Sequence, residues 1–223
     1  IHPTGKVEVS LDAKGVAAYR IETDVAWDFI ESNEKLLKLV RHSKAFIFGS
    51  LVARGASFDA LKTFFELASF NVFDLNLRPP FYSDSLLIEL MGYAQMLKFN
   101  DEELYLVAEM LNSPFHSMDQ HIEFIAKETQ TEIICVTQGI FGAVLYHKEQ
   151  WIYNSGFKIK VVDTVGAGDA FLATLIYGLT ANETPLNSLN RACAMGALVA
   201  GSAGANPNIS EKELMQFIGG YNI

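Results

Sequence analysis

Hydrophobic residues recur along the chain in two patterns, which are short apolar or alternating runs and longer segments with helical spacing. The runs predict strands at 45–50, 70–76, 95–99, 132–137, 142–147, 150–154 and 158–163. The longer segments predict helices at 56–69, 83–93, 101–111, 117–129, 168–180, 187–201 and 210–218. Because strands alternate with helices, we expect an α/β fold whose mainly parallel central sheet is flanked by helices on both faces.

The start of the chain has a different pattern. Residues 5–11 and 16–22 alternate between apolar and polar side chains, and Asp12-Ala-Lys-Gly15 separates them. This arrangement predicts a β-hairpin within residues 1–25. Its apolar faces suit a small sheet that covers a site, or a surface that pairs with a second copy of the chain.

Composition limits the classes of function. Half of the 223 residues are hydrophobic, which is enough for one domain, 1–223, with a substantial core. The net charge of −9 argues against a general nucleic-acid partner or an anionic membrane surface. Cys135 and Cys193 both lie in apolar runs, as expected of reduced, buried thiols in a cytoplasmic protein. The small-residue run 192–205 is too short and too weakly apolar to span a membrane.

Residues 161–171 carry the clearest chemistry. A β-branched run ends at Asp163, Gly166 and Gly168 form a turn, and Asp169 begins an apolar helical pattern. The first N–H groups of a helix bind anions, and glycines let a phosphate approach the backbone. A carboxylate there would repel phosphate, so we expect Asp169 to take a proton from a hydroxyl group. The N–H groups of Gly166, Ala167 and Gly168 would then hold the developing negative charge.

Two known glycine-rich motifs do not fit this turn. A dinucleotide-binding fingerprint would place a third glycine at 171, where the chain has Phe171. A P-loop needs Gly-Lys-Ser/Thr, and the sequence has no such string. An ordinary strand–helix turn with an acid in the first helical turn stays open as an alternative.

Polar residues also follow several predicted strands. Asn76, Asn100, Thr137 and Asp163 all fall at or just past the carboxyl ends of predicted strands. Ligands of open α/β folds bind at that edge of the sheet. We therefore expect one site there.

The segment Asp163–Phe171 resembles the signature of the ribokinase-like (PfkB) family of carbohydrate kinases. Further matches follow in the family's order, namely Asp74-Leu-Asn76-Leu-Arg78, Asn100-Asp-Glu-Glu103, Thr137-Gln-Gly139-Ile-Phe-Gly142 and Gly204-Ala205-Asn206-Pro207. The opening residues and Val25-Ala-Trp-Asp28 resemble fructokinase-type members. The resemblance implies a ribokinase-like fold with a small β-lid partly present, and transfer of the γ-phosphate of ATP to a sugar hydroxyl with Asp169 as base.

The resemblance also implies roles for the other matching residues. It assigns the sugar to Asn76, Arg78 and Asp169, the nucleotide to Asn100, Glu103, Thr137, Gly139, Gly142, Gly204 and Asn206, Mg²⁺ to Glu103 through water, and a monovalent cation to Asp163. ATP and Mg²⁺ are the implied cofactors, and K⁺ is a third candidate. Structural roles stay open beside these: a capping box for Asn100 and Glu103, a surface ion pair for Arg78, and a turn for Gly139.

Family members have a preceding segment that carries the first strand and a sugar-binding element, so we expect the chain to lack its N-terminal part. We expect a homodimer when that part is present. Three functions stay open beside a fructokinase: a ketodeoxygluconate, ribose or nucleoside kinase. A non-catalytic or truncated nucleotide-binding member is the alternative from another class.

Overall fold

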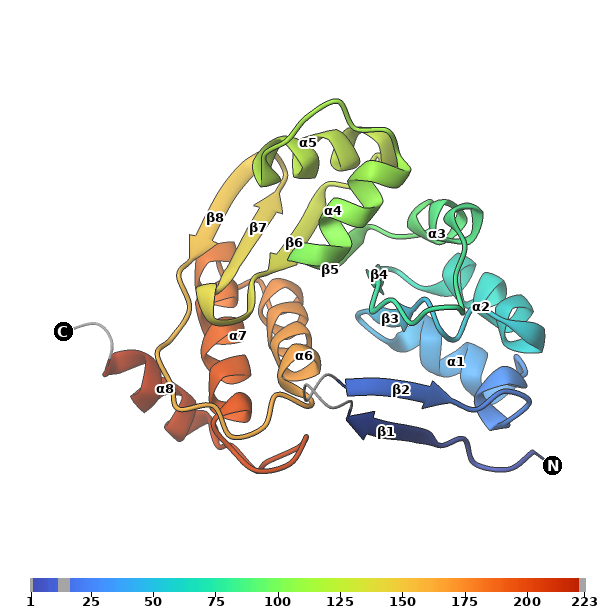
Figure 1. Cartoon of the computed structure of the whole chain (residues 1–223), viewed down its shortest axis with the longest axis horizontal. Coiled ribbons are helices and arrows are strands. Elements are labelled where there is room, and N and C mark those ends of the chain that lie inside the picture. Colours follow the sequence, from blue (N-terminus) through green and yellow to red (C-terminus); the bar gives the residue numbers. More distant parts are fainter. Residues whose placement is uncertain (1, 12–16, 221–223) are drawn as a thin grey trace.

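The computed structural model describes residues 2–11 and 17–220. Its centre is a six-stranded sheet in the order β3-β4-β5-β6-β7-β8 (Figure 1). The strands are β3 Phe46–Gly49, β4 Asn71–Asp74, β5 Met96–Asn100, β6 Ile133–Thr137, β7 Ala143–His147 and β8 Gln150–Asn154. The first four strands are parallel and the last two antiparallel, which confirms the α/β architecture with a mainly parallel sheet.

Helices cover both faces of the sheet. They are α1 Glu34–His42, α2 Gly55–Leu67, α3 Asp84–Met91, α4 Asp101–Met110, α5 Met118–Thr129, α6 Ala167–Thr180, α7 Pro185–Ala200 and α8 Glu211–Gly219. The parallel strands follow one another in order, so right-handed crossovers place α2 to α5 on the same face. Helices α6 and α7 pack on the other face (Figure 1).

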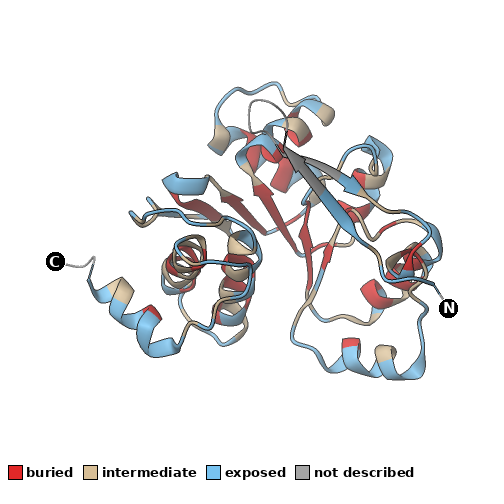
Figure 2. Ribbon diagram, turned by 60° about the horizontal axis from the view of Figure 1, so that its bottom comes forward, coloured by how far each residue is buried: buried red, intermediate tan, exposed pale blue. Residues whose placement is uncertain are grey.

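The alternation of side chains along the strands divides the core in two. In β5, Leu97 and Phe99 belong to the cluster beneath α1 to α5, whereas Met96 belongs to the cluster beneath α6 and α7. Successive residues of a strand point to opposite faces, so Lys98 lies on the side of α6. Burial is greatest in these central strands (Figure 2).

The predicted hairpin is present as a separate two-stranded sheet. Strands β1 Val7–Leu11 and β2 Ala17–Ile21 are antiparallel, with Val7 opposite Ile21 (Figure 1). The predicted turn at 12–15 lies outside the described residues. A short 3₁₀ helix, η1 Ala26–Asp28, follows the hairpin.

Two segments differ from the sequence prediction. The helix α1 was not predicted, yet the side chain of Asn33 caps it by accepting a hydrogen bond from the N–H of Leu36. The predicted strand at 158–163 is wrong, because this segment forms no strand and pairs with no strand of either sheet in the described residues. Instead, Val162 and Asp163 donate backbone hydrogen bonds to the carbonyl of Ala200, at the end of α7.

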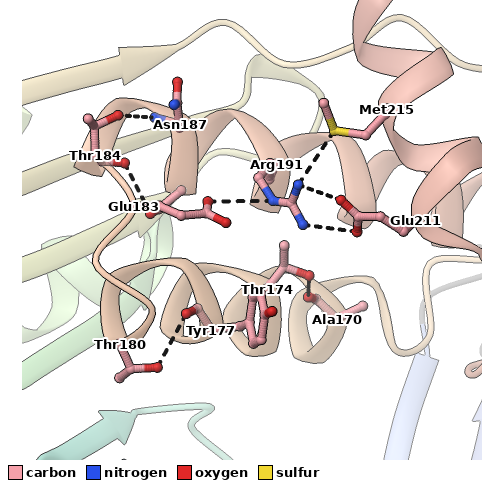
Figure 3. Close-up of polar contacts among 11 residues, drawn as sticks. Ala170, Thr174, Tyr177, Thr180, Glu183, Thr184, Asn187, Arg191, Glu211 and Met215 are labelled. Carbon is pink, nitrogen blue, oxygen red and sulfur yellow. Dashed lines mark hydrogen bonds and ion pairs between the residues drawn. The ribbon is translucent and has the colours of Figure 1, made fainter.

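The last helix is held by one arginine. Arg191 of α7 donates to both carboxylate oxygens of Glu211 at 2.7 and 3.0 Å, and Glu183 lies 3.6 Å away on its other side (Figure 3). Most of α8 is exposed, so this pair and the buried Leu214 anchor the helix (Figure 2). Within residues 2–11 and 17–220, no helix has both the length and the apolar character to cross a membrane.

Candidate active site

The start of α6 carries the predicted base. Gly166 is the N-cap, in a left-handed conformation with φ of 80°, and it offers no side-chain cap. Ala167 donates its N–H to the carbonyl of Thr164 at 3.2 Å, and the N–H of Ala170 bonds to Gly166. The N–H of Ala167 is therefore engaged within the turn, whereas no backbone acceptor among the described residues takes those of Gly166, Gly168 and Asp169. Asp169 is exposed in this first turn.

A second turn lies against the first. A side chain on Gly166 would collide with the carbonyl oxygen of Ala205, so the backbones of the two segments touch. This contact brings Gly204, Ala205 and Asn206 beside the N-terminus of α6. Gly204 has a φ of 81°, and all three residues are exposed. The structure thereby joins two motifs that lie far apart in the sequence.

A cavity of about 230 Å³ opens beside the start of α6. Thr137, Gly139, Gly142, Ala167 and Gly168 line it, as do Gly156, Phe157, Ile159, Thr164, Phe171, Cys193, Gly196, Ala197 and Ala200. Its walls are therefore mainly small or apolar, which is typical of pockets for small molecules. Five predicted site residues meet here, whereas Asp169, Asn100 and Glu103 lie outside its lining.

Two glycines close one wall of this cavity. Gly142 and Gly156 have φ values of 85° and 79°, and a side chain on either would collide with the backbone near the other. Only glycine fits both positions. The sequence motif identified Gly142, but sequence reasoning missed Gly156, as well as the small residues of α7 that line the same cavity. The glycine and alanine run at 192–205 was the available signal for those residues.

The junction of β5 and α4 holds the next pair. Asn100 caps α4 by accepting from the N–H of Glu103 at 2.7 Å, and Glu103 accepts from the N–H of Asn100 at 2.8 Å. The capping box that the sequence left open as an alternative is therefore present. The other oxygen of Glu103 accepts from the N–H of Leu77 at 2.9 Å. The buried carboxylate thus ties the loop after β4 to the start of α4.

That loop carries the two remaining sugar-site candidates. Asn76 has a φ of 41° and is exposed, two residues beyond the end of β4. Arg78 is half-buried, and its guanidinium lies 3.5 Å from the carbonyl of Leu77. Because Glu103 fixes Leu77 between them, both side chains project from an anchored loop.

Thr137 and Asp163 occupy different settings. Thr137 ends β6 and donates its hydroxyl to the carbonyl of Phe99 at 3.3 Å, while it also lines the cavity. Asp163 does not end a strand, which corrects the prediction that four polar residues follow strand ends. Its carboxylate accepts from the N–H of Val165 at 3.0 Å and so shapes the turn that leads into α6.

The two thiols are buried in the same layer as α6. Burial raises the pKa of Cys193, which borders the cavity, to about 12, and it also raises the pKa of Cys135. Both cysteines are therefore neutral packing groups at physiological pH. No pair of the described cysteines forms a disulfide, as expected for reduced thiols.

The donor groups fit a nucleotide with a weakly coordinated metal. Within the described ranges no three His, Cys, Asp or Glu side chains gather in a metal-binding group. Mg²⁺ needs no such cluster, because it commonly takes one or two carboxylates, phosphate oxygens and water. The anchored Glu103 carboxylate and the anion-binding start of α6 supply that kind of environment.

Comparisons with known proteins show which family the chain resembles. A fructokinase of Salmonella typhimurium is 26% identical over 219 residues, which cover 92% of this chain and 70% of that protein. Two solved structures of the fructokinase of Vibrio cholerae O395, each with a TM-score of 0.77, cover 98% of this chain and 74% of theirs. One, at 25% identity, contains fructose, ADP and calcium, and the other, a double mutant at 24%, contains fructose, ADP and potassium.

These matches extend over most of the chain but not over the whole of its relatives. The chain spans between 60% and 74% of the length of several bacterial fructokinases that it matches. The sequence model of the pfkB family carbohydrate kinases matches residues 4–212, which include the four motifs and the Asp163–Phe171 segment described above. The resemblance found in the sequence is confirmed, and the chain belongs to the pfkB family of carbohydrate kinases, which are ATP-dependent phosphotransferases.

Proposed function

We propose that the protein transfers the γ-phosphate of ATP to a hydroxyl group of a sugar, and that D-fructose is its substrate. One observation carries the proposal: the uncapped start of α6, with Asp169 in its first turn, opens beside a cavity with glycine walls. The fructokinase relatives support fructose over other sugars.

In the proposed reaction, Asp169 accepts the proton of the attacking sugar hydroxyl. The sugar oxygen bonds to the γ-phosphorus while the bond between that phosphorus and the oxygen of ADP breaks. The N–H groups of Gly166, Gly168 and Asp169 stabilise the negative charge on the transferring group, and Ala167, whose N–H bonds to Thr164, shapes the turn that presents them. A nucleotide in the cavity would place its terminal phosphate near these N–H groups, because Gly168 lines the cavity and also carries one of the N–H groups.

We assign the remaining residues to supporting roles. Asn76 and Arg78 would hold the sugar, and Thr137, Gly139, Gly142, Gly204, Asn206 and Asn100 would surround the nucleotide. Mg²⁺, when bound, would neutralise phosphate charge, and Glu103 would face it through water. Asp163 and the turn at 204–206, which meets α6 at Gly166, would face a monovalent cation such as K⁺.

The test is ATP consumption by the protein in its full natural length, with Mg²⁺ and K⁺, against a sugar panel led by D-fructose. Turnover that is greatest on fructose supports the proposal. Turnover on ketodeoxygluconate, ribose or a nucleoside, with fructose inert, would keep the reaction and replace the substrate. Bound ATP without turnover on any sugar would favour a non-catalytic nucleotide-binding protein.

We also propose that the protein forms a homodimer through the β1–β2 hairpin. The hairpin stands apart from the central sheet, and its Val7 is exposed (Figure 1). Light scattering of the full-length protein tests this, and a monomer at micromolar concentration would contradict it.

A further inference from the structure

A buried ion pair lies beneath the start of α6. Lys98 of β5 and Asp74 of β4 are register partners on neighbouring parallel strands, and Lys98 Nζ donates to Asp74 Oδ1 at 3.0 Å. Each residue is only 8% exposed. The resemblance and the proposed reaction give neither residue a role.

The ammonium group of Lys98 lies close to the first turn of α6. A Cβ placed on Gly168 would lie 3.8 Å from Lys98 Nζ, so the ammonium lies against the backbone of the second residue of α6. Gly168 also lines the cavity, and the next residue is Asp169. The charge of Lys98 therefore lies beside the backbone of the first turn of α6, next to the residue that precedes Asp169.

Stability alone does not account well for such a pair. Removing two charges from water costs free energy that their attraction often fails to repay, so buried ion pairs can commonly be replaced by apolar residues. The other groups that act electrostatically on the Asp74 carboxylate are acidic: Glu103 of α4 and Asp169 of α6 both repel it. The neutral thiol of Cys135 lies close enough to feel the charges of Lys98 and Asp74. Burial raises the pKa of Asp74, and Lys98 opposes this rise.

We propose that Lys98 is a positioning residue for phosphoryl transfer, whose ammonium, held by Asp74, adds a fixed positive charge beneath the anion-binding N–H groups of Gly168 and Asp169. This inference rests on the proposed function. The transferring phosphoryl group and the Asp169 carboxylate are both negative, and a fixed cation below them lets both occupy one site. Lys98 and Asp74 are themselves buried, so the charge of Lys98 is screened less than that of a surface lysine.

The deciding variant removes both charges with little change in volume. In Lys98→Met/Asp74→Asn we expect the melting temperature to stay near that of the wild type. We expect kcat to fall about tenfold to a hundredfold, with little change in the KM for the sugar. Lys62→Met is the matched control, because Lys62 pairs with Glu89 on the surface, and it should keep the wild-type kcat. A folded double variant with the wild-type kcat would overturn the proposal.

Two further measurements keep the outcome clear. If the double variant does not fold, the kcat values of Lys98→Arg and Lys98→Met are compared instead. We expect the arginine variant, which keeps the charge, to have a kcat at least several-fold higher. Equal losses of kcat in the two variants would refute the role. ADP affinity, measured by calorimetry, needs no turnover. Loss of ADP affinity in Lys98→Met supports the role of this charge, whether or not the wild type phosphorylates a sugar. Failure of the wild type to phosphorylate any sugar would count against the proposed function but not against the role of Lys98.

Discussion

Gly166 and Ala205 touch through their backbones. The left-handed N-cap of α6 and the carbonyl oxygen of Ala205 leave no space for a side chain between them. The two turns are thereby fixed against each other, and the first N–H groups of α6 acquire a fixed surrounding that a single strand–helix turn would not provide.

Gly166→Ala should therefore disturb both turns. A left-handed conformation costs a non-glycine residue about 1–2 kcal/mol, and the contact with Ala205 adds to this cost. We expect a lower free energy of unfolding and a fall in kcat, measured by urea denaturation and by ATP consumption. Gly219→Ala is the control, since nothing lies within 4 Å of that position in α8, and it should leave both quantities nearly unchanged. Equal effects of the two substitutions would contradict the interpretation.

Asp169→Asn tests the base. The amide keeps the shape of the side chain but cannot accept the proton, so we expect kcat to fall by a factor of about 10²–10⁴. ADP affinity should change little, because the N–H groups of α6 remain. Asp101→Asn, at an exposed acid in the first turn of α4, should keep normal turnover. Near-normal turnover of Asp169→Asn would remove this residue from the mechanism.

Glu103→Gln tests the anchored carboxylate. Both oxygens accept backbone N–H bonds, from Leu77 and Asn100, and the amide nitrogen of glutamine would face one of those donors. We expect a loss of about 1–3 kcal/mol in the free energy of unfolding. The KM for the sugar should rise, because the loop of Asn76 and Arg78 is released. Glu102→Gln, on the exposed side of the same helix, is the control and should leave stability and KM unaltered.

The buried ring of His121 should make the protein less stable at acid pH. It is buried, its Nδ1 lies 2.9 Å from the Ser113 hydroxyl, and burial lowers the pKa of its ring, with a smaller effect from His116. Between the lowered pKa of the folded state and the usual value near 6.5, the unfolded chain binds more protons than the folded one. The contribution of neutral His121 to the free energy of unfolding should therefore be fully present above about pH 6.5. It should be lost as the pH falls from there through the lowered pKa of the folded state.

Urea denaturation at about pH 5, 6 and 7 measures this dependence. His121→Gln should flatten it, because glutamine does not titrate, and the exposed His42→Gln should leave the slope as it is. Burial also lowers the pKa of His147, which contributes with the same sign. A slope that His121→Gln leaves unchanged would mean that other groups control the acid sensitivity.

Arg191→Met tests the attachment of α8. The substitution removes two charge-assisted hydrogen bonds to Glu211 (Figure 3), and we expect a loss of about 1–2 kcal/mol in stability with kcat retained. Arg20→Met removes the pair with Glu8, in which both side chains are exposed, and should cost less than about 0.5 kcal/mol. Equal stability of the two variants would show that apolar contacts, such as those of Leu214 and of Phe217 with Phe157, hold α8 without the ion pair.

Much of the architecture could be predicted because local signals and tertiary packing agree. The helix α4 begins where Asn100 and Glu103 form a capping box, and β5 before it is a buried run with no competing pattern. The residues 158–163 show the limit of this reasoning. Their apolar and charged side chains alternate as in a strand, but a strand also needs a neighbour, and Val162 instead bonds to the end of α7.

Parts of the candidate site could not be predicted for a similar reason. The contact between Gly166 and Ala205 and the approach of Lys98 to Gly168 depend on how α6 is placed over the sheet, which no short motif encodes. The helix α1 was missed although Asn33 and the spacing of its leucines were visible, because most of its residues are polar or exposed and only Val40 is buried. Motifs thus indicated candidate residues, and packing determined which of them meet.

The two sides of the site belong to different layers of the molecule. Asp169 lies on α6, whereas Asn100 and Glu103 begin a helix on the opposite face of the sheet. The separation between the proposed base and the β5–α4 junction is therefore set by the thickness of the apolar layer on which α6 rests, around Met96, Cys135 and Leu175. Substitutions in that layer, far from any ligand, would change the reach of Asp169 and so the size of the acceptor that the protein can phosphorylate.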